Sequence, residues 1–326
     1  MLHDILSGLL PVFFGLGLGY FAGKCGLVDN QNLSTLNTLL VKIALPLTLF
    51  VSLAGTSEAT LHEHIKVVVV LLLTMPPMFV LAYLVQVKLR HATIGEAAIQ
   101  AQVVASSNFS AVGLTLLMLL FGQEGALLVA VAITISQMTT APLTRALLRL
   151  YVTQEKEKRG EVAVSSPVRD FVGSLKTSVT EPLFLGPFLG LCFALLGLSL
   201  PEMAKAAMQP MVSTTGGIGL FLTGLLLSAQ RLSITPNVCL STLANIGLLP
   251  LWAFAVSNLL QFPPHVTVYC VFLMALPTGY VSIVYGAGLG VKPLAPSSTL
   301  VLTTIGSIIS LSLAIAWMHG QKGALF

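Results

Sequence analysis

Two short polar runs interrupt apolar stretches of the sequence, and their residue types could bind a ligand. The first run is Ser106-Ser107-Asn108-Phe109-Ser110, followed by Gly113, and the second is Pro277-Thr278-Gly279-Tyr280. In a membrane, backbone freed by such breaks cannot face lipid, because each unsatisfied group costs several kcal/mol. Paired interrupted helices are typical of a transporter binding site, where the N-terminal ends of half-helices attract anions. The alternative is a pair of kinks whose hydroxyls bond back to their own helices.

A lysine lies within another apolar stretch. Lys42 is the one Lys, Arg, Asp or Glu well inside such a stretch, and Pro46, which breaks the same helix, follows four residues later. At helical rise, Lys42 lies about 13 Å from the start of the stretch. A lysine at the membrane centre costs about 2.5–3.5 kcal/mol on insertion scales and usually marks a functional path. We interpret Lys42 as a cation that compensates an anionic substrate; the alternative is a lysine that extends toward the interface.

Three further polar residues, Ser136, Gln137 and Asn245, could form part of a Na⁺ site built from hydroxyls and carbonyls. Each of them also fits an ordinary hydrogen bond between helices. No Asp, Glu or His falls in the middle of an apolar stretch, which argues against a proton relay built on those residues. The coupling ion, Na⁺ or H⁺, therefore stays open. Neither a Cys/His cluster nor an enzyme motif occurs, so we expect no metal, no cofactor and no catalysis.

The composition places these residues in a membrane protein. The chain has 326 residues, of which 55% are hydrophobic and 9% are charged. A soluble domain carries about 25% charged residues, so most of this surface must face lipid. The net charge of +4 does not indicate nucleic-acid binding, because the basic residues lie in loops where membrane orientation explains them.

Ten apolar stretches are long enough to be membrane spans. They lie near 5–23, 33–54, 65–87, 97–120, 125–150, 182–199, 208–229, 237–260, 266–289 and 296–318. The longest polar stretch, 153–180, separates five spans from five. We therefore predict an all-α membrane protein with a first repeat at 1–152, a linker at 153–180 and a second repeat at 181–326. Because five is odd, the second half enters the membrane inverted.

A shift of 171 residues relates the two halves. It places Pro11, Gly15 and Gly19 on Pro182, Gly186 and Gly190, and it overlays all five pairs of spans. It also places Pro46 on Gly217, and the run 106–108 on 277–279. The glycine pairs suit close helix contact, either within the chain or between protomers.

The distribution of Lys and Arg orients the spans. Twelve lie on one side: Lys24, Lys88, Arg90, Arg145, Arg149, Lys156, Lys158, Arg159, Arg169, Lys176, Arg231 and Lys292. Three lie on the other: Lys66, Lys205 and Lys322. Basic loops stay cytoplasmic, so we expect both termini on the outer side of the membrane and the 153–180 linker inside.

Three segments of the sequence are distinctive: Leu39–Leu53, Gly216–Gln230 and Ala275–Tyr280. They resemble segments of the auxin efflux carrier family, and the likeness extends over essentially the whole chain. Within that family the chain is most similar to the bacterial malonate transporters, in which a lysine precedes an Ala-Leu-Pro triplet as Lys42 precedes Ala44-Leu45-Pro46 here. Family members often have a proline in the fourth-span break, whereas this chain has Gly113-Leu114-Thr115.

The resemblance implies an elevator-type secondary transporter of the bacterial inner membrane, assembled as a homodimer. Spans 1, 2, 6 and 7 would form a scaffold, and spans 3–5 and 8–10 a mobile domain in which broken helices 4 and 9 cross. Asn108 and Pro277 would lie at the crossing and Lys42 would face it. The expected substrate is malonate or a related short dicarboxylate. The alternatives are an exporter of another carboxylate and a channel or sensor without alternating access.

Overall fold

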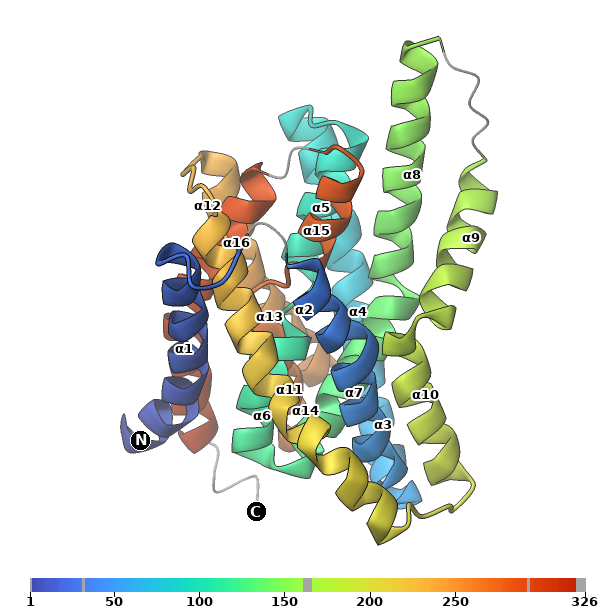
Figure 1. Cartoon of the computed structure of the whole chain (residues 1–326), viewed down its shortest axis with the longest axis vertical. Helices are drawn as coiled ribbons and strands as arrows, with labels where there is room; N and C mark the ends of the chain where they lie inside the picture. The colour runs from blue at the N-terminus through green and yellow to red at the C-terminus, as the bar shows by residue number, and fades with distance from the viewer. Residues whose placement is uncertain (1, 31–32, 161–165, 292–293, 321–326) are drawn as a thin grey trace.

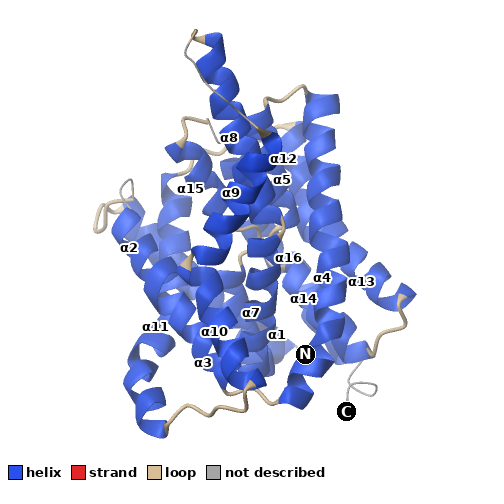
Figure 2. Ribbon diagram, turned by 90° about the vertical axis from the view of Figure 1, so that its right-hand side faces the viewer, coloured by secondary structure: helices blue, strands red, loops and turns tan. Residues whose placement is uncertain are grey.

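The computed structural model describes residues 2–30, 33–160, 166–291 and 294–320. Its secondary structure over these residues is helical, apart from one isolated β-bridge between Ser107 and Thr278. Most helices run along the long axis of the molecule (Figures 1 and 2). The chain is thus an all-α protein, as the sequence predicts.

The described residues of the first half form eight α-helices, several of them joined by π-helical turns. Their bounds are α1 Leu2–Lys24, α2 Ser34–Leu39, α3 Leu45–Ala54, α4 Glu58–Leu84, α5 Ile94–Ala105, α6 Leu114–Phe121, α7 Gln123–Met138 and α8 Thr140–Lys158. The π turns are Leu40–Ala44, Val85–Leu89 and Phe109–Gly113.

The described residues of the second half also form α-helices, two of which are joined by a π turn. Its helices are α9 Pro167–Thr180, α10 Pro182–Leu195, α11 Glu202–Ala229, α12 Pro236–Leu243, α13 Leu249–Leu259, α14 Pro264–Ala275, α15 Val281–Gly288 and α16 Leu294–Gly320, with a π turn at Ala244–Leu248.

Among the described residues, seven helical stretches are long and apolar enough to cross a membrane. They correspond to the predicted spans 1, 2, 3, 5, 7, 8 and 10. The predicted span six is the shorter helix α10, which meets α9 at a bend of 61°. Predicted spans four and nine are each divided into two shorter helices, α5 with α6 and α14 with α15. The chain is therefore built as an integral membrane protein.

The segment 153–180, expected to be a polar linker, is largely helical. α8 continues from the apolar stretch to Lys158, and α9 occupies Pro167–Thr180. Pro167 starts α9 at a position where its missing N–H costs nothing. The polar character of this segment indicated its exposure, whereas its helical structure depends on packing of α9 against α8.

Prolines explain two of the π turns. A proline in a helix cannot donate a hydrogen bond to the carbonyl four residues earlier. Pro46 follows the π turn Leu40–Ala44 by two residues, and Pro250 follows Ala244–Leu248 by two residues. In both helices the backbone widens just before the proline, as π bulges do. Pro46 thus bulges the helix that carries Lys42, and α3 continues beyond it.

Two helix pairs pack in equivalent ways. α1 lies along α11 and α10 lies along α3. A Cβ atom on Gly19 would collide with the carbonyl oxygen of Phe221, and one on Gly190 would collide with that of Phe50. Gly190 follows Gly19 by 171 residues, and Phe221 follows Phe50 by the same interval. The glycine pairs identified in the sequence therefore make their close contacts within the chain.

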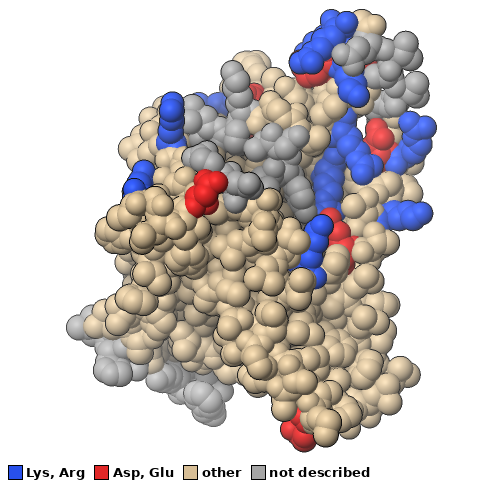
Figure 3. All heavy atoms as spheres, in the orientation of Figure 1, with Lys and Arg blue, Asp and Glu red and all other residues tan. Residues whose placement is uncertain are grey.

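The two ends of the molecule differ in charge. α1 begins and α16 ends at the lower end of Figure 1. Figure 3 shows Lys and Arg side chains gathered toward the upper part of the same view, around α8 and α9, above a broad region with few charges. On the face that Figure 3 shows, most basic side chains thus lie toward the end opposite the one where α1 begins and α16 ends.

Candidate functional site

The two broken helices cross and are joined through their backbones. Ser107 and Thr278 form an antiparallel β-bridge. The N–H of Asn108 donates to the carbonyl of Pro277 at 2.7 Å, and the N–H of Gly279 donates to that of Ser106 at 3.4 Å. Each break therefore satisfies part of the other's freed backbone, which the low dielectric of a membrane interior demands.

The fourth-span break forms without a proline. α5 ends at Ala105 and Ser106 is extended, while the Asn108 side chain accepts a hydrogen bond from the N–H of Ala111 at 3.2 Å. Asn108 therefore caps the second half-helix as an N-cap residue. Gly113 lies in its first turn, where a Cβ would crowd the Leu276 side chain and the Asn108 carbonyl. Capping by Asn108 and close packing at Gly113 thus form the break in place of the proline that the resemblance led us to expect.

Thr278 and Asn245 stabilise the end of α5. The buried Thr278 hydroxyl donates to the carbonyls of Val103 and Ser106. The fully buried Asn245 amide donates to the carbonyls of Val103 at 3.4 Å and Val104 at 3.1 Å. Helix C-termini leave carbonyls unsatisfied, and these side chains supply the missing donors. Asn245, proposed above for an ion site, thus lies against the crossing as a capping residue.

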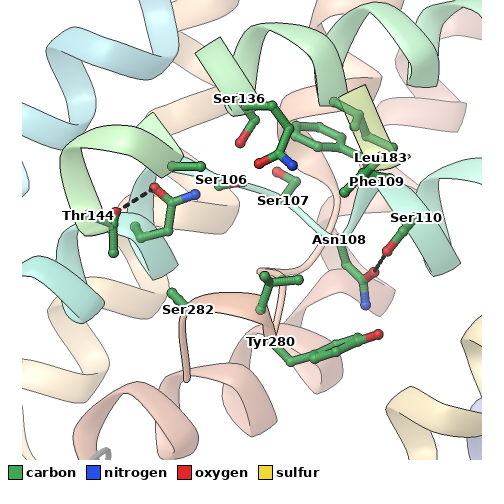
Figure 4. Close-up of a pocket in the computed structure, with 16 residues that line it drawn as sticks. Ser106, Ser107, Asn108, Phe109, Ser110, Ser136, Thr144, Leu183, Tyr280 and Ser282 are labelled. Atoms are coloured by element: carbon green, nitrogen blue, oxygen red, sulfur yellow. Dashed lines mark hydrogen bonds between the residues drawn. The ribbon is translucent and has the colours of Figure 1, made fainter. Parts of the chain in front are cut away.

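A cavity of about 80 Å³ lies beside the crossing (Figure 4). Its walls come from both breaks and from α5, α7, α8 and α10. The lining residues are Gln102, Ser106, Ser107, Asn108, Phe109, Ser110, Ile133, Ser136, Gln137, Ala141, Thr144, Leu183, Gly279, Tyr280, Val281 and Ser282. The cavity therefore brings together the predicted residues Ser106, Ser107, Asn108, Ser110, Ser136, Gln137, Gly279 and Tyr280.

Two serine hydroxyls in this lining are buried without a hydrogen-bond partner. Ser107 is 4% exposed and Ser282 is 3% exposed, and neither Oγ has a partner within the described structure. Ser107 belongs to the fourth-span break, and Ser282 lies in the first turn of α15. Buried polar groups are nearly always satisfied, so these two hydroxyls are available to donate to a ligand in the cavity.

The crossing also contacts the helices on its other side. The Asn108 amide donates to the Thr223 hydroxyl of α11 at 3.4 Å. The Tyr280 hydroxyl donates to the Asn37 side chain of α2 at 3.3 Å. These polar contacts join the broken helices to α2 and α11, which belong to the second span of each half.

Lys42 and Pro46 lie away from the crossing, whereas Gly113, Thr278 and Asn245 contact it without lining the cavity. Lys42 is exposed on the π turn Leu40–Ala44, which packs against α10 and α11, and it is not part of the described lining. Pro46 is buried, and its backbone lies against Gly186 of α10. Pro277, although at the crossing, contributes its carbonyl to the backbone pairing and no side chain to the lining.

An ion pair lies next to the cavity, between α8 and the start of α10. Arg145 Nη2 is 2.8 Å from Glu181 Oε2, and Arg145 Nη1 donates to the Ser178 hydroxyl at 2.7 Å. The Gln137 amide donates to the same Glu181 oxygen at 3.1 Å. Because Gln137 lines the cavity, Glu181 lies one side chain away from it.

The sequence did not point to five residues at or beside the cavity as site residues: Gln102, Thr144, Ser282, Arg145 and Glu181. A helical-face count could have found Thr144 and Gln102. Ala141 and Thr144 are three residues apart on α8 and both line the cavity. Gln102 lies one turn before Ser106. The pairing of Arg145 with Glu181 spans 36 residues, and no local pattern indicates it.

The described residues contain no group of three or more His, Cys, Asp or Glu side chains placed to hold a metal ion. The lining of the cavity is instead rich in hydroxyl and amide donors, with the starts of two half-helices beside it. Such donors suit an anion, since helix N-termini carry free N–H groups and a partial positive charge.

Comparison with known proteins identifies the family of the chain. A family model described as "Membrane transport protein" matches residues 4–315. The chain is 22% identical to the "Uncharacterized transporter YfdV" of Escherichia coli (strain K12), over 99% of both chains. It is 27% identical to the "Putative malonate transporter" of Rhizobium meliloti (strain 1021), over 94% of both chains. The resemblance noted in the sequence is confirmed, and the chain belongs to the membrane transport protein family, that is, the auxin efflux carrier family.

Proposed function

We propose that this transporter is a secondary carrier of a small organic anion, malonate or a related short dicarboxylate, and that it works by alternating access of the elevator type. The observation that carries the proposal is the pair of buried, unpartnered hydroxyls of Ser107 and Ser282 at the crossing of two broken helices. Each can donate a hydrogen bond to a carboxylate, and hydrogen bonds to charged groups are the stronger ones. The starts of two half-helices add partial positive charge beside them.

The packing of the helices supports an inverted repeat of ten spans. The seven long helices, the shorter α10 and the two broken helices together make ten. The contacts of α1 with α11 and of α10 with α3 are related by the same 171-residue shift that relates the sequences. Two halves of opposite orientation give a carrier two equivalent access states.

The contacts also support a division into two moving parts. α1, α3, α10 and α11 pair closely and would form the scaffold. The remaining spans, with the crossing at their centre, would form the mobile part. The two parts meet at small or polar contacts, such as Asn108 with Thr223 and Tyr280 with Asn37. Such contacts allow one part to slide past the other more readily than an interlocked apolar core would.

The remaining details of the proposal concern substrate, orientation and assembly. The cavity admits only a small molecule, and one relative is named as a malonate transporter. The basic end of the molecule would face the cytoplasm of a bacterium, following the positive-inside rule. A homodimer would form through the scaffold. The transport assay described next, run with and without Na⁺ and a pH gradient, determines whether transport is coupled to Na⁺ or H⁺.

Reconstituted protein should exchange radiolabelled malonate in counterflow, at a rate that saturates with malonate concentration. The assay compares malonate, succinate and acetate, each with and without Na⁺ and a pH gradient. Saturable exchange of a different carboxylate would keep the carrier and change its substrate. A flux that rises without saturation would contradict the carrier and indicate a channel.

Replacing Lys42 with Gln should raise the KM for malonate about tenfold at an unchanged protein level. Removing one charge from the path of a dianion costs about 1–2 kcal/mol at the dielectric of a protein surface, and 1.4 kcal/mol is a factor of ten. Because Lys42 is exposed, folding should be unaffected. Lys42→Arg should keep most of the activity, and Lys176→Gln, which removes an exposed charge from α9, serves as control. Unchanged transport by Lys42→Gln would remove this lysine from the mechanism.

A further inference from the structure

We propose that Arg145 binds a carboxylate of the transported anion, and that Glu181 occupies this position when the site is empty. The proposal deepens the function proposed above and rests on it. It assigns the anion site a fixed cation that sequence patterns did not reveal, and it gives Glu181 the role of a built-in competitor.

The geometry places Arg145 within reach of the cavity through a single intervening group. Thr144, its neighbour on α8, lines the cavity, and so does Leu183, two residues after Glu181. Gln137, also in the lining, donates to the same Glu181 oxygen that Arg145 contacts. If the Glu181 side chain swings out, Gln137 Nε2 and Arg145 Nη2 can donate instead to a carboxylate in the cavity.

The exchange leaves the net charge beside Arg145 unchanged, because one carboxylate replaces another. Arg145 is only 10% exposed, and a buried cation left without a partner is strongly unfavourable. A carboxylate of the substrate replaces the negative charge of Glu181 beside the guanidinium, whereas a neutral molecule would not. Glu181 is 27% exposed, so it can leave for water at lower cost than Arg145 could. This selects for anions and against neutral solutes.

The exchange also affects how the two parts of the protein hold together. Glu181 is the residue between α9 and α10, at their 61° bend, and α10 packs along α3 of the proposed scaffold. Arg145 and Gln137 belong to α8 and α7, in the proposed mobile part. The Arg145–Glu181 contact therefore bridges the two parts. A substrate carboxylate that takes over Arg145 releases this bridge, so movement would follow loading.

Thermal unfolding with increasing malonate tests the proposal directly. The purified protein is titrated with sodium malonate, against sodium chloride at matched ionic strength, and the malonate concentration that gives half of the maximal Tm increase is recorded. Glu181→Gln should lower that concentration about tenfold, because the site is then no longer occupied by its own carboxylate. Arg145→Gln should abolish the malonate effect, and the double variant should behave like Arg145→Gln.

Two further variants keep the test decisive. Glu181→Asp shortens the carboxylate and should shift the half-maximal concentration in the same direction by a smaller factor, which covers poor folding of Glu181→Gln. Glu155→Gln removes the carboxylate of the exposed Lys158–Glu155 pair and should leave the malonate dependence unchanged. An ion pair that only stabilises the fold would lower the Tm in both Glu181 and Arg145 variants without opposite effects on malonate binding, and that result would overturn the proposal.

The outcomes for this site and for the proposed function are separable. Saturable malonate counterflow by the unaltered protein, together with an unchanged half-maximal concentration in Glu181→Gln, would retain the carrier and reject the role of Glu181. The variants could instead show the expected malonate dependence of the Tm while no tested acid gives counterflow. That result would retain the carboxylate site and reject the carrier. A Tm that does not respond to malonate in any variant would overturn the malonate site at Arg145, and counterflow then decides separately whether the carrier stands.

Discussion

A chain carrying Ser107→Ala and Ser282→Ala together should bind malonate about 100-fold more weakly than the unaltered protein. A hydrogen bond to a charged group contributes about 1.5–3 kcal/mol, and 1.4 kcal/mol corresponds to a tenfold change in affinity. Each hydroxyl should therefore account for about a factor of ten, and each single variant should show about that loss. Equilibrium binding of radiolabelled malonate to purified protein measures the effect.

The same double variant should fold as well as the unaltered protein. Neither hydroxyl has a partner in the described structure, so its removal leaves no protein group unsatisfied and relieves the desolvation of a buried polar atom. The Tm without malonate should be equal or slightly higher. Ser52→Ala, a serine of α3 that bonds to its own helix at Thr48, is the matched control and should keep full affinity. Unchanged binding by the double variant would place the anion elsewhere.

Replacing Gly19 with Ala should destabilise the protein by about 2–3 kcal/mol. The added methyl group would collide with the carbonyl oxygen of Phe221 on α11, and a backbone atom cannot move aside as a flexible side chain can. Inserting a carbon into a packed interface typically costs about 1–3 kcal/mol, which for a protein of this size lowers the Tm by about 5 °C or more. Thermal unfolding in detergent provides the measurement.

Gly17 offers a control in the same helix. A Cβ on Gly17 meets nothing within 4 Å in the described structure, and alanine is the better helix former by about 1 kcal/mol. Gly17→Ala should therefore leave the Tm unchanged or raise it. Gly190→Ala, at the equivalent contact with Phe50, should resemble Gly19→Ala. Equal stability of the Gly17 and Gly19 variants would contradict the close α1–α11 contact.

Much of the fold followed from local residue chemistry. Polar residues, prolines and glycines inside apolar runs predicted where spans four and nine break, and the breaks lie at Ser106–Asn108 and at Leu276–Tyr280. The 171-residue shift predicted which breaks belong together, and the Ser107–Thr278 bridge joins them. These features are local or repeat along the chain, so the sequence alone suffices to find them.

The composition of the cavity was less predictable. Asn245 and Ser136 looked alike as polar residues within spans, yet Asn245 caps α5 while Ser136 lines the cavity. Lys42, prominent in the sequence, is exposed outside the lining. The rotation of each helix decides which side chains face inward. One extra residue in a π turn rotates every following side chain by about 100°. The polarity of a residue does not indicate that rotation.

The sequence by itself therefore determined the membrane setting, the positions of the helix breaks, the pairing of the two breaks and the family. Only the tertiary structure decided that the glycine contacts lie within the chain, that Ser107 and Ser282 are left unpartnered beside one cavity, and that Arg145 meets Glu181 next to it. The physical reason is that these features depend on contacts between residues far apart in the chain. Their geometry is set by how whole helices pack, and no short stretch of residues encodes it.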